Sequence, residues 1–229
     1  MTLAWCKTQS LELTSSQQEG LKWLAILSMT LDHVNRIILA GDLPAFTQFG
    51  RLAFPLFAFL IAYNITRRGV APRRYFLPLL AFGILSQPVY MVAFEKMYLN
   101  IMFTLLLGVM YLALVKWLVN YKFQPLIAHV VAFSLFLLPS LAVSYDAPGV
   151  FLVPVLAGFL RFPHLFLLPL VAFYLLLTND LTPVSAYTLL LLPAVYLASH
   201  LPLTLPRSSK WLFYGFYPVH LFVLAFLGR

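Results

Sequence analysis

The sequence predicts an all-α fold, a polytopic transmembrane helical bundle of about nine spans. Of the 229 residues, 62% are hydrophobic and 10% are charged, against about 25% charged in an average soluble domain. The mean hydropathy is +0.90. Such a chain has too little polar surface to cover a water-facing globule, so lipid is the expected solvent. No repeat or linker divides the sequence, and we expect residues 1–229 to form one domain.

The first twenty residues are expected to form a cytoplasmic N-terminal segment. They contain acidic residues and lack the basic start, short apolar core and cleavage site of a signal peptide. Ser16 and Glu19 have the spacing of a capping box, which predicts a helix that starts near Gln17. The single cysteine, Cys6, excludes an internal disulfide.

Nine apolar segments approach the length of about 20 residues that a helix needs to cross the hydrocarbon core. The sixth and seventh are short, and they form either two spans or one broken pair around residues 161–163. Prolines inside many of the segments predict breaks in the helices. The segments are Leu21–Ala40, Phe49–Thr66, Arg74–Phe94, Tyr98–Val119, Pro125–Val143, Val150–Leu160, His164–Leu177, Val184–His200 and Trp211–Leu227.

The charges between these segments predict the orientation. With a cytoplasmic N-terminus, most of the 15 basic residues fall on the cytoplasmic side, as the positive-inside rule requires, and only Lys96 and Arg229 fall outside. Acidic Asp42, Glu95, Asp146 and Asp180 all fall outside. The chain is therefore predicted to be a multi-pass protein of the bacterial inner membrane, with its C-terminus outside the cytoplasm. The net charge of +8 needs no nucleic-acid partner, because no polar face interleaves basic and aromatic residues.

Asp32 is the only acidic residue inside an apolar span. An ionisable group at the bilayer centre costs roughly 2.5–3.5 kcal/mol on insertion scales, so it marks a functional site by default. Arg36 lies one helical turn away on the same face, where the two side chains can pair. Mutual neutralisation of Asp32 and Arg36 is the alternative interpretation of this pair alone.

Further polar residues fall in the same half of the bilayer. His33 and His220 each lie about ten residues, or about 15 Å, from a cytoplasmic helix end, which places both near the midplane. Four residues lie in the outer half of the bilayer, with Arg51 expected to open the second span. These four are Arg36, Arg51, Gln87 and Asn100.

The composition of this group predicts base catalysis with anion stabilisation. Two arginines and one aspartate leave a cation that an incoming anion or a developing oxyanion would neutralise. Neutral imidazole accepts a proton near neutral pH, and either His33 or His220 is a candidate. Asp32 and His33 are adjacent and point about 100° apart, so we expect Asp32 to orient His220 instead. No P-loop, metal-spaced His/Cys set or nucleophile-elbow serine is present, and no metal is expected.

At these residues the sequence resembles the TraX family, membrane proteins that acetylate the N-terminus of conjugative pilin. The family is distantly similar to membrane acyltransferases that acylate surface sugars. The matching blocks cover nearly the whole chain in family order, whereas residues 121–206 match only in character. The blocks are Leu31–Arg36, Phe49–Ala58, Ser86–Pro88, Asn100–Thr104 and Phe213–Leu221.

The resemblance implies transfer of acetyl from acetyl-CoA to the α-amino group of a pilin subunit in the lipid membrane, through a cavity that crosses half the bilayer. His33 or His220 would take the proton, and Arg36 or Arg51 would stabilise the oxyanion. The implied substrate-binding residues are Asn35, Gln87, Asn100, Tyr214 and Tyr217, of which the two tyrosines are equally explained as packing aromatics. The implied phosphate cradle for acetyl-CoA is Arg67, Arg68, Arg73 and Arg74, which ordinary topology determinants explain as well.

Two other functions use the same residues. A sugar O-acetyltransferase would need the same base and anion site with a hydroxyl acceptor. A proton-coupled transporter also uses intramembrane Asp, His and Arg, but transporters often repeat their polar sites in two related halves. Here the polar residues lie in the first four spans and the last, which disfavours transport.

Overall fold

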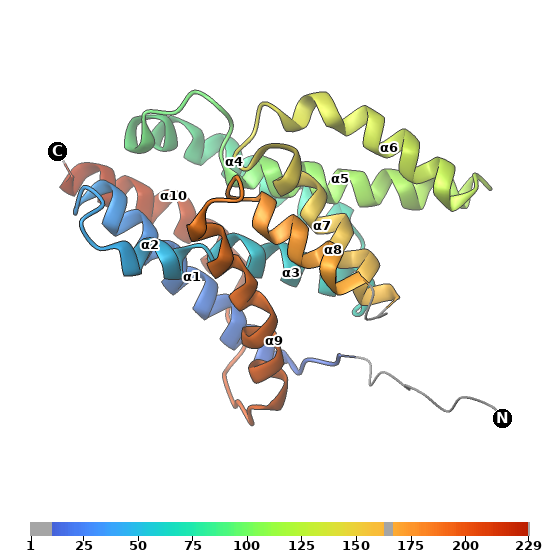
Figure 1. Ribbon diagram of the computed structural model, residues 1–229, viewed down its shortest axis with the longest axis horizontal. Helices are drawn as coiled ribbons and strands as arrows, with labels where there is room; N and C mark the ends of the chain where they lie inside the picture. Colours follow the sequence, from blue (N-terminus) through green and yellow to red (C-terminus); the bar gives the residue numbers. More distant parts are fainter. Residues whose placement is uncertain (1–10, 163–166, 229) are drawn as a thin grey trace.

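The computed structural model describes residues 11–162 and 167–228, and within these ranges the chain is helical with no named strand. Cys6, Lys7, the expected start of the seventh span at His164, and Arg229 lie outside the described residues. Figure 1 shows the helices gathered into one bundle. In chain order they are α1 (Ser15–Ile37), α2 (Pro44–Gly50), α3 (Ala53–Thr66), α4 (Arg73–Phe94), α5 (Ile101–Asn120), α6 (Pro125–Ser140), α7 (Asp146–Arg161), α8 (Leu168–Leu177), the 3-10 helix η2 (Pro183–Leu190), α9 (Leu191–His200) and α10 (Lys210–Leu227).

Four helical segments among the described residues are long and apolar enough to cross a membrane: residues 44–66, 73–94, 101–120 and 210–227. Their outward faces carry large apolar side chains. On α4 and α10, for example, Leu77 and Phe226 are 69% and 75% exposed. In lipid such a surface is the favourable one, because it leaves no polar group in the hydrocarbon. The structure therefore confirms an all-helical fold with helices able to span a membrane.

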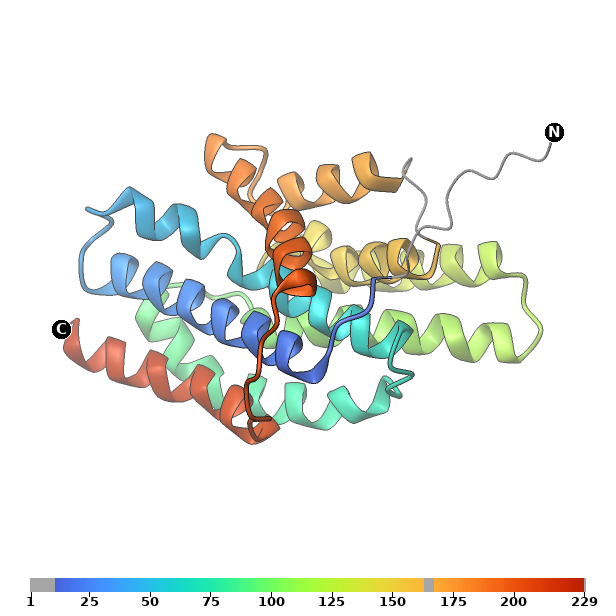
Figure 2. The same ribbon diagram turned by 90° about the horizontal axis from the view of Figure 1, so that it is seen from below.

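Helices α1, α4 and α10 lie side by side (Figure 2), and residues of all three line the cavity described below. Helix α4 packs along α10, and α1 contacts α10 from the other side. Helices α3, α5 and α7 pack behind them and hold most of the apolar core, which includes Leu56, Val109 and Leu152. Helix α1 rises about 33 Å over its length at 1.5 Å per residue, close to the thickness of the hydrocarbon core.

The start of α1 differs from the prediction by two residues. Thr14 is the N-cap, and its side chain accepts from the Gln17 amide while the Gln17 side chain accepts from the Thr14 amide. This capping box replaces the one expected between Ser16 and Glu19. Both pairs have the same sequence spacing, so the spacing does not decide which pair caps the helix. Contacts with other segments of this chain decide it. Glu19 is left free for another interaction.

The second expected span is interrupted at Arg51. Helix α2 begins at Pro44, earlier than the expected Phe49, and a turn at Arg51 and Leu52 separates it from α3. Pro55 explains the break, because it has no N–H to donate to the Arg51 carbonyl one turn earlier. Arg51 therefore lies at a helix junction. In the eighth expected span, residues 183–190 form a 3-10 helix before α9.

Candidate functional site

His33 of α1 and His220 of α10 are in direct contact. The Nδ1 atom of His33 lies 2.8 Å from the Nε2 atom of His220, and the two rings are nearly parallel, with an interplanar angle of 7°. The Nδ1 atom of His220 lies 2.8 Å from the Phe216 carbonyl oxygen. The structure therefore joins the two histidines of the sequence prediction into a pair.

The contacts of the pair assign its tautomers. The Phe216 oxygen only accepts, so His220 Nδ1 carries a hydrogen and, in the neutral ring, Nε2 does not. His33 Nδ1 must then donate to His220 Nε2, which leaves the lone pair on His33 Nε2. No described residue hydrogen-bonds to this Nε2, and His33, but not His220, lines the large cavity. His33 is thus the ring that presents a proton acceptor to the cavity.

Asp32 and Arg36 form the expected ion pair, with Arg36 Nε 3.0 Å from Asp32 Oδ2. The second carboxylate oxygen of Asp32 is buried and has no hydrogen-bond partner, and the same holds for Nε of Arg51. Arg51 interacts electrostatically with Asp32 and with Tyr145. One buried acceptor and one buried donor therefore stand unpaired in the same region, a costly arrangement that a bound group would relieve.

The expectation that Asp32 orients His220 was wrong. The carboxylate pairs with Arg36 on its own helix, whereas His220 is held by His33 and the Phe216 carbonyl. Sequence spacing did predict that Asp32 and His33 point in different directions on α1. The rotation of α10, which brings His220 against His33, depends on packing between distant helices.

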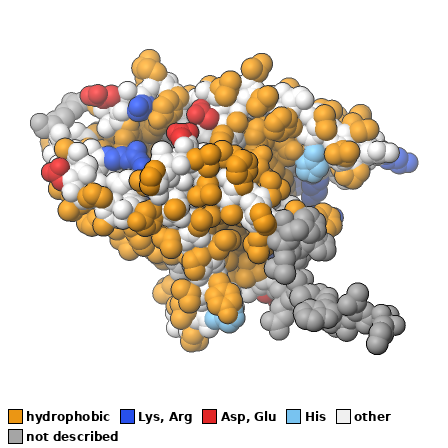
Figure 3. Space-filling view, in the orientation of Figure 1, with side chains coloured by type: hydrophobic (Ala, Val, Ile, Leu, Met, Phe, Trp, Pro, Cys, Tyr) orange, Lys and Arg blue, Asp and Glu red, His pale blue; other side chains and the backbone are white. Residues whose placement is uncertain are grey.

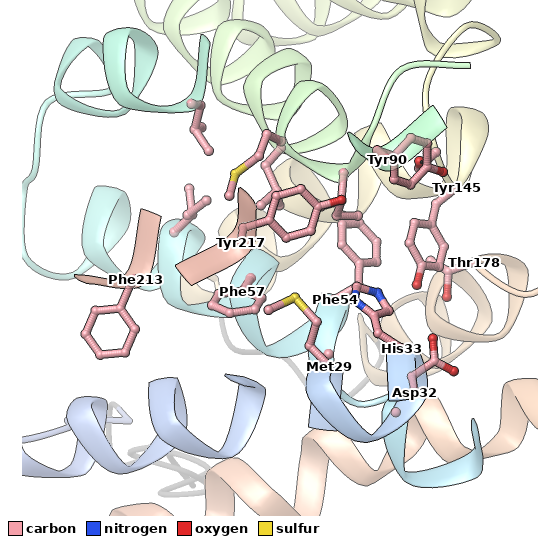
Figure 4. Close-up of a pocket in the computed structure, with 18 of the residues that line it drawn as sticks. Met29, Asp32, His33, Phe54, Phe57, Tyr90, Tyr145, Thr178, Phe213 and Tyr217 are labelled. Carbon is pink, nitrogen blue, oxygen red and sulfur yellow. The ribbon is translucent and has the colours of Figure 1, made fainter. Parts of the chain in front are cut away.

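A cavity of about 1670 Å³ connects this site to both ends of the bundle. Residues from the first and the last turns of α1, α4 and α10 line it. Figure 4 shows Phe57, Met29 and Phe54 between Phe213, near one end, and His33 with Asp32. Exposed lining residues at each end, such as Arg207 and Asp180, open the cavity on both sides of the protein. Its middle is therefore apolar and aromatic, with polar groups at the ends and beside His33.

One end of the cavity, here called the basic mouth, suits a polyanion. The N-terminal ends of α1, α4 and α10 all contribute to it, and helix N-termini favour negative charge. Its basic residues come from α1, the segment after α3, the start of α4, the segment after α9 and the start of α10. They are Lys22, Arg68, Arg74, Arg207 and Lys210.

Half of the expected phosphate cradle belongs to this mouth. Arg68 and Arg74 line the cavity, whereas Arg67 and Arg73 do not. Sequence reasoning missed Lys22, Arg207 and Lys210, although it placed all three on the same side as the arginine cluster. That shared side was the available signal, but only the fold brings the three segments together.

The opposite end carries carboxylates. Asp146 and Asp180 line it, and burial together with the nearby Asp180 raises the pKa of the Asp146 carboxyl above its ordinary value. Acidic and basic side chains gather at the upper left of Figure 3, over α2 and the turn between α8 and η2, on a face that is otherwise mostly hydrophobic. The cavity thus joins the basic mouth to an end that carries both acidic and basic side chains.

The remaining predicted residues divide into two groups. Tyr214 and Tyr217 line the cavity. Asn35, Gln87 and Asn100 lie outside its lining and make packing hydrogen bonds. The Asn35 amide binds Thr47 and the Leu43 N–H, and Gln87 accepts from the Asn100 side chain at 2.8 Å.

The helices and the site define a membrane protein with a histidine pair at the wall of an internal cavity. A family model described as TraX protein matches residues 17–228, nearly the whole chain, and the chain belongs to the TraX family. Membership implies a conjugation-related protein associated with pilin. No curated protein and no solved structure matches the chain significantly.

Proposed function

We propose that this TraX protein is an acetyltransferase that moves acetyl from acetyl-CoA to the N-terminal amine of a membrane-inserted pilin subunit. The observation that carries the proposal is the cavity that joins the basic mouth to the open Nε2 of His33. Family membership supports pilin as the acceptor. The site lies in the bacterial inner membrane, with the basic mouth toward the cytoplasm, where acetyl-CoA is found.

The dimensions of the cavity suit this donor. Lys22 and His33 are eleven residues apart on α1, an axial rise of about 16 Å. A pantetheine arm has about a dozen bonds between its phosphate oxygen and its sulfur, roughly 15 Å when extended. Phosphates held at the basic mouth therefore place the thioester beside His33. The apolar walls formed by Met29, Phe54 and Phe57 accommodate the arm between them.

The side chains around His33 have the roles that acyl transfer needs. The unpaired oxygen of Asp32 accepts a hydrogen bond from the acceptor amine, and the amine nitrogen attacks the thioester carbon. His33 Nε2 takes the proton that the nitrogen loses as the N–C bond forms. The unpaired Nε of Arg51 donates to the oxyanion. The C–S bond then breaks, and the same proton passes from Nε2 to the departing sulfur.

Acetyl transfer is tested with membranes that contain wild type or His33→Ala, labelled acetyl-CoA and processed pilin. We expect wild type to add one acetyl group to the pilin N-terminus, seen by intact mass, and His33→Ala to add none while it accumulates normally. His220→Ala should retain a reduced rate, since it removes the acceptor that fixes the His33 tautomer.

Unmodified pilin with wild-type membranes would overturn the proposal. Label recovered in surface polysaccharide instead would establish a sugar O-acetyltransferase. Full activity of His33→Ala would exclude this imidazole as the base and leave a pilin acetyltransferase of different mechanism.

A further inference from the structure

Glu19 is a buried carboxylate in the basic mouth with no role in the transfer chemistry. Its residue is 2% exposed, and it lines the cavity together with Lys22. One carboxylate oxygen accepts from Lys22 Nζ at 2.6 Å. The other oxygen, Oε2, is buried without a hydrogen-bond partner. A buried oxygen of this kind costs free energy unless a donor hydrogen-bonds to it.

The surroundings of Glu19 restrict the group that binds there. A phosphate is repelled by a carboxylate, although the cations Arg74 and Lys210 line the same mouth. The group must therefore be an uncharged or cationic donor attached to a phosphorylated molecule. Aromatic Phe213 and Tyr214 line this end as well. Lys22 Nζ covers one face of Phe213 and Phe82 covers one face of Tyr214, which leaves the other face of each ring for a planar base.

The position of Glu19 along α1 identifies which part of the donor reaches it. Glu19 lies fourteen residues before His33, an axial rise of about 21 Å. This is more than the roughly 15 Å of an extended pantetheine arm. With the thioester at His33, the arm ends before it reaches Glu19, so the phosphates and the nucleoside both lie in the mouth that Glu19 and Lys22 line.

We infer that Glu19 Oε2 is a binding point for the nucleoside of the acyl donor and accepts from its exocyclic amino group or a ribose hydroxyl. The inference rests on the proposed function for the identity of the donor. Lys22 orients the carboxylate through its other oxygen. The basic mouth then binds both parts of a nucleotide: its cations bind the phosphates, and Glu19 binds the nucleoside.

Direct binding to the purified protein in detergent tests the inference, without pilin or turnover. The probes are CoA, 4′-phosphopantetheine, CoA with hypoxanthine in place of adenine, and CoA with a 2′-deoxyribose. A hydrogen bond to a charged group is worth about 1.5–3 kcal/mol. We therefore expect Glu19→Gln to weaken CoA binding by about tenfold or more and not to weaken 4′-phosphopantetheine binding, because the change also removes a negative charge beside the phosphate-binding cations.

The modified nucleosides test wild type independently of any folding defect in the variant. One of the two should bind wild type about tenfold more weakly than CoA does, and it identifies the donor group. The same modification should have no further effect in Glu19→Gln. The matched control is Glu95→Gln, the same change at the opposite end of the cavity, which should bind CoA as wild type does.

Equal loss of CoA and 4′-phosphopantetheine binding in Glu19→Gln would overturn the inference, as would wild-type affinity for both modified nucleosides. Acetyl transfer to pilin in either case would leave the proposed function standing. Glu19-dependent binding of CoA without acetyl transfer to any acceptor would retain the nucleoside site and overturn the proposed function.

Discussion

Arg36 and Arg51 carry the same charge in the same cavity, but the hydrogen bonding of their Nε atoms differs. The Nε atom of Arg36 is bound to Asp32, whereas the Nε atom of Arg51 is buried without a partner. A donor that is already held in place and not yet used costs no reorganisation when negative charge develops beside it. In the proposed mechanism, Arg51 is thus the better oxyanion donor of the two.

We expect Arg51→Lys to lower kcat for acetyl transfer by about 10²-fold, the loss typical of one oxyanion donor. A lysine keeps the charge but loses the planar donor geometry. Arg36→Lys should lose less, since an ammonium still pairs with Asp32 one turn away. Initial rates in membranes with equal amounts of each variant measure the difference. Equal losses in the two variants would contradict the distinction drawn between the arginines.

Sequence reasoning predicted the residue-scale contacts that lie within one helix and few that join distant helices. The Asp32–Arg36 pair follows from the helical repeat alone. Equal depth predicted that His33 and His220 share a layer, but their hydrogen bond depends on the rotation of α10. Glu19 was interpreted as a cap for its own helix. Only the fold shows it inside the cavity.

Helix α2 approaches α1 so closely that Gly50 has no room for a side chain. A Cβ on Gly50 would overlap the Asp32 Cβ and lie 3.0 Å from the Asp32 Cγ. The close approach brings the α2–α3 junction, and with it Arg51, up to Asp32. The break that Pro55 predicts in the sequence therefore places Arg51 beside Asp32. The sequence alone does not predict which residue Arg51 approaches.

We expect Gly50→Ala to lower thermal stability in detergent, with a cost of about 1–3 kcal/mol for overpacking, and to reduce transfer because Asp32 must move. Gly158→Ala is the matched control. Gly158 lies within α7 with no atom near its added Cβ, so the alanine should be neutral or stabilise by about 0.5–1 kcal/mol. Thermal unfolding of both variants in one detergent makes the comparison. Equal stability of Gly50→Ala and wild type would show that α2 can move away without penalty.

On the scale of the whole molecule, composition predicted the all-helical membrane fold, and loop charges predicted an orientation. The positions of the longest spans were predicted well, since apolar length is a local property. The shorter elements from α8 to α9 were not. Their segments resemble spans in hydrophobicity, but their lengths of 8 and 10 residues are set by prolines and tertiary contacts.

Reporter fusions after Gly69, Lys96 and Lys122 test the orientation. Gly69 and Lys122 follow α3 and α5, and Lys96 follows α4, which runs in the opposite direction between them. We expect the fusions after Gly69 and Lys122 to report from the cytoplasm and the fusion after Lys96 to report from the other side. Cytoplasmic signal from all three would show that α4 does not cross the membrane.

A cavity with openings at both ends also has an electrical consequence. A continuous water-filled passage through a bilayer conducts ions and dissipates the membrane potential unless side chains block it. Around His33 the rings of Phe94 and Tyr217 pack edge-on against the imidazole, and His220 closes off its Nδ1 side. In the proposed orientation these are therefore the side chains that would have to close the cavity between its two openings, so the residues beside the proposed reaction site would also keep the membrane sealed.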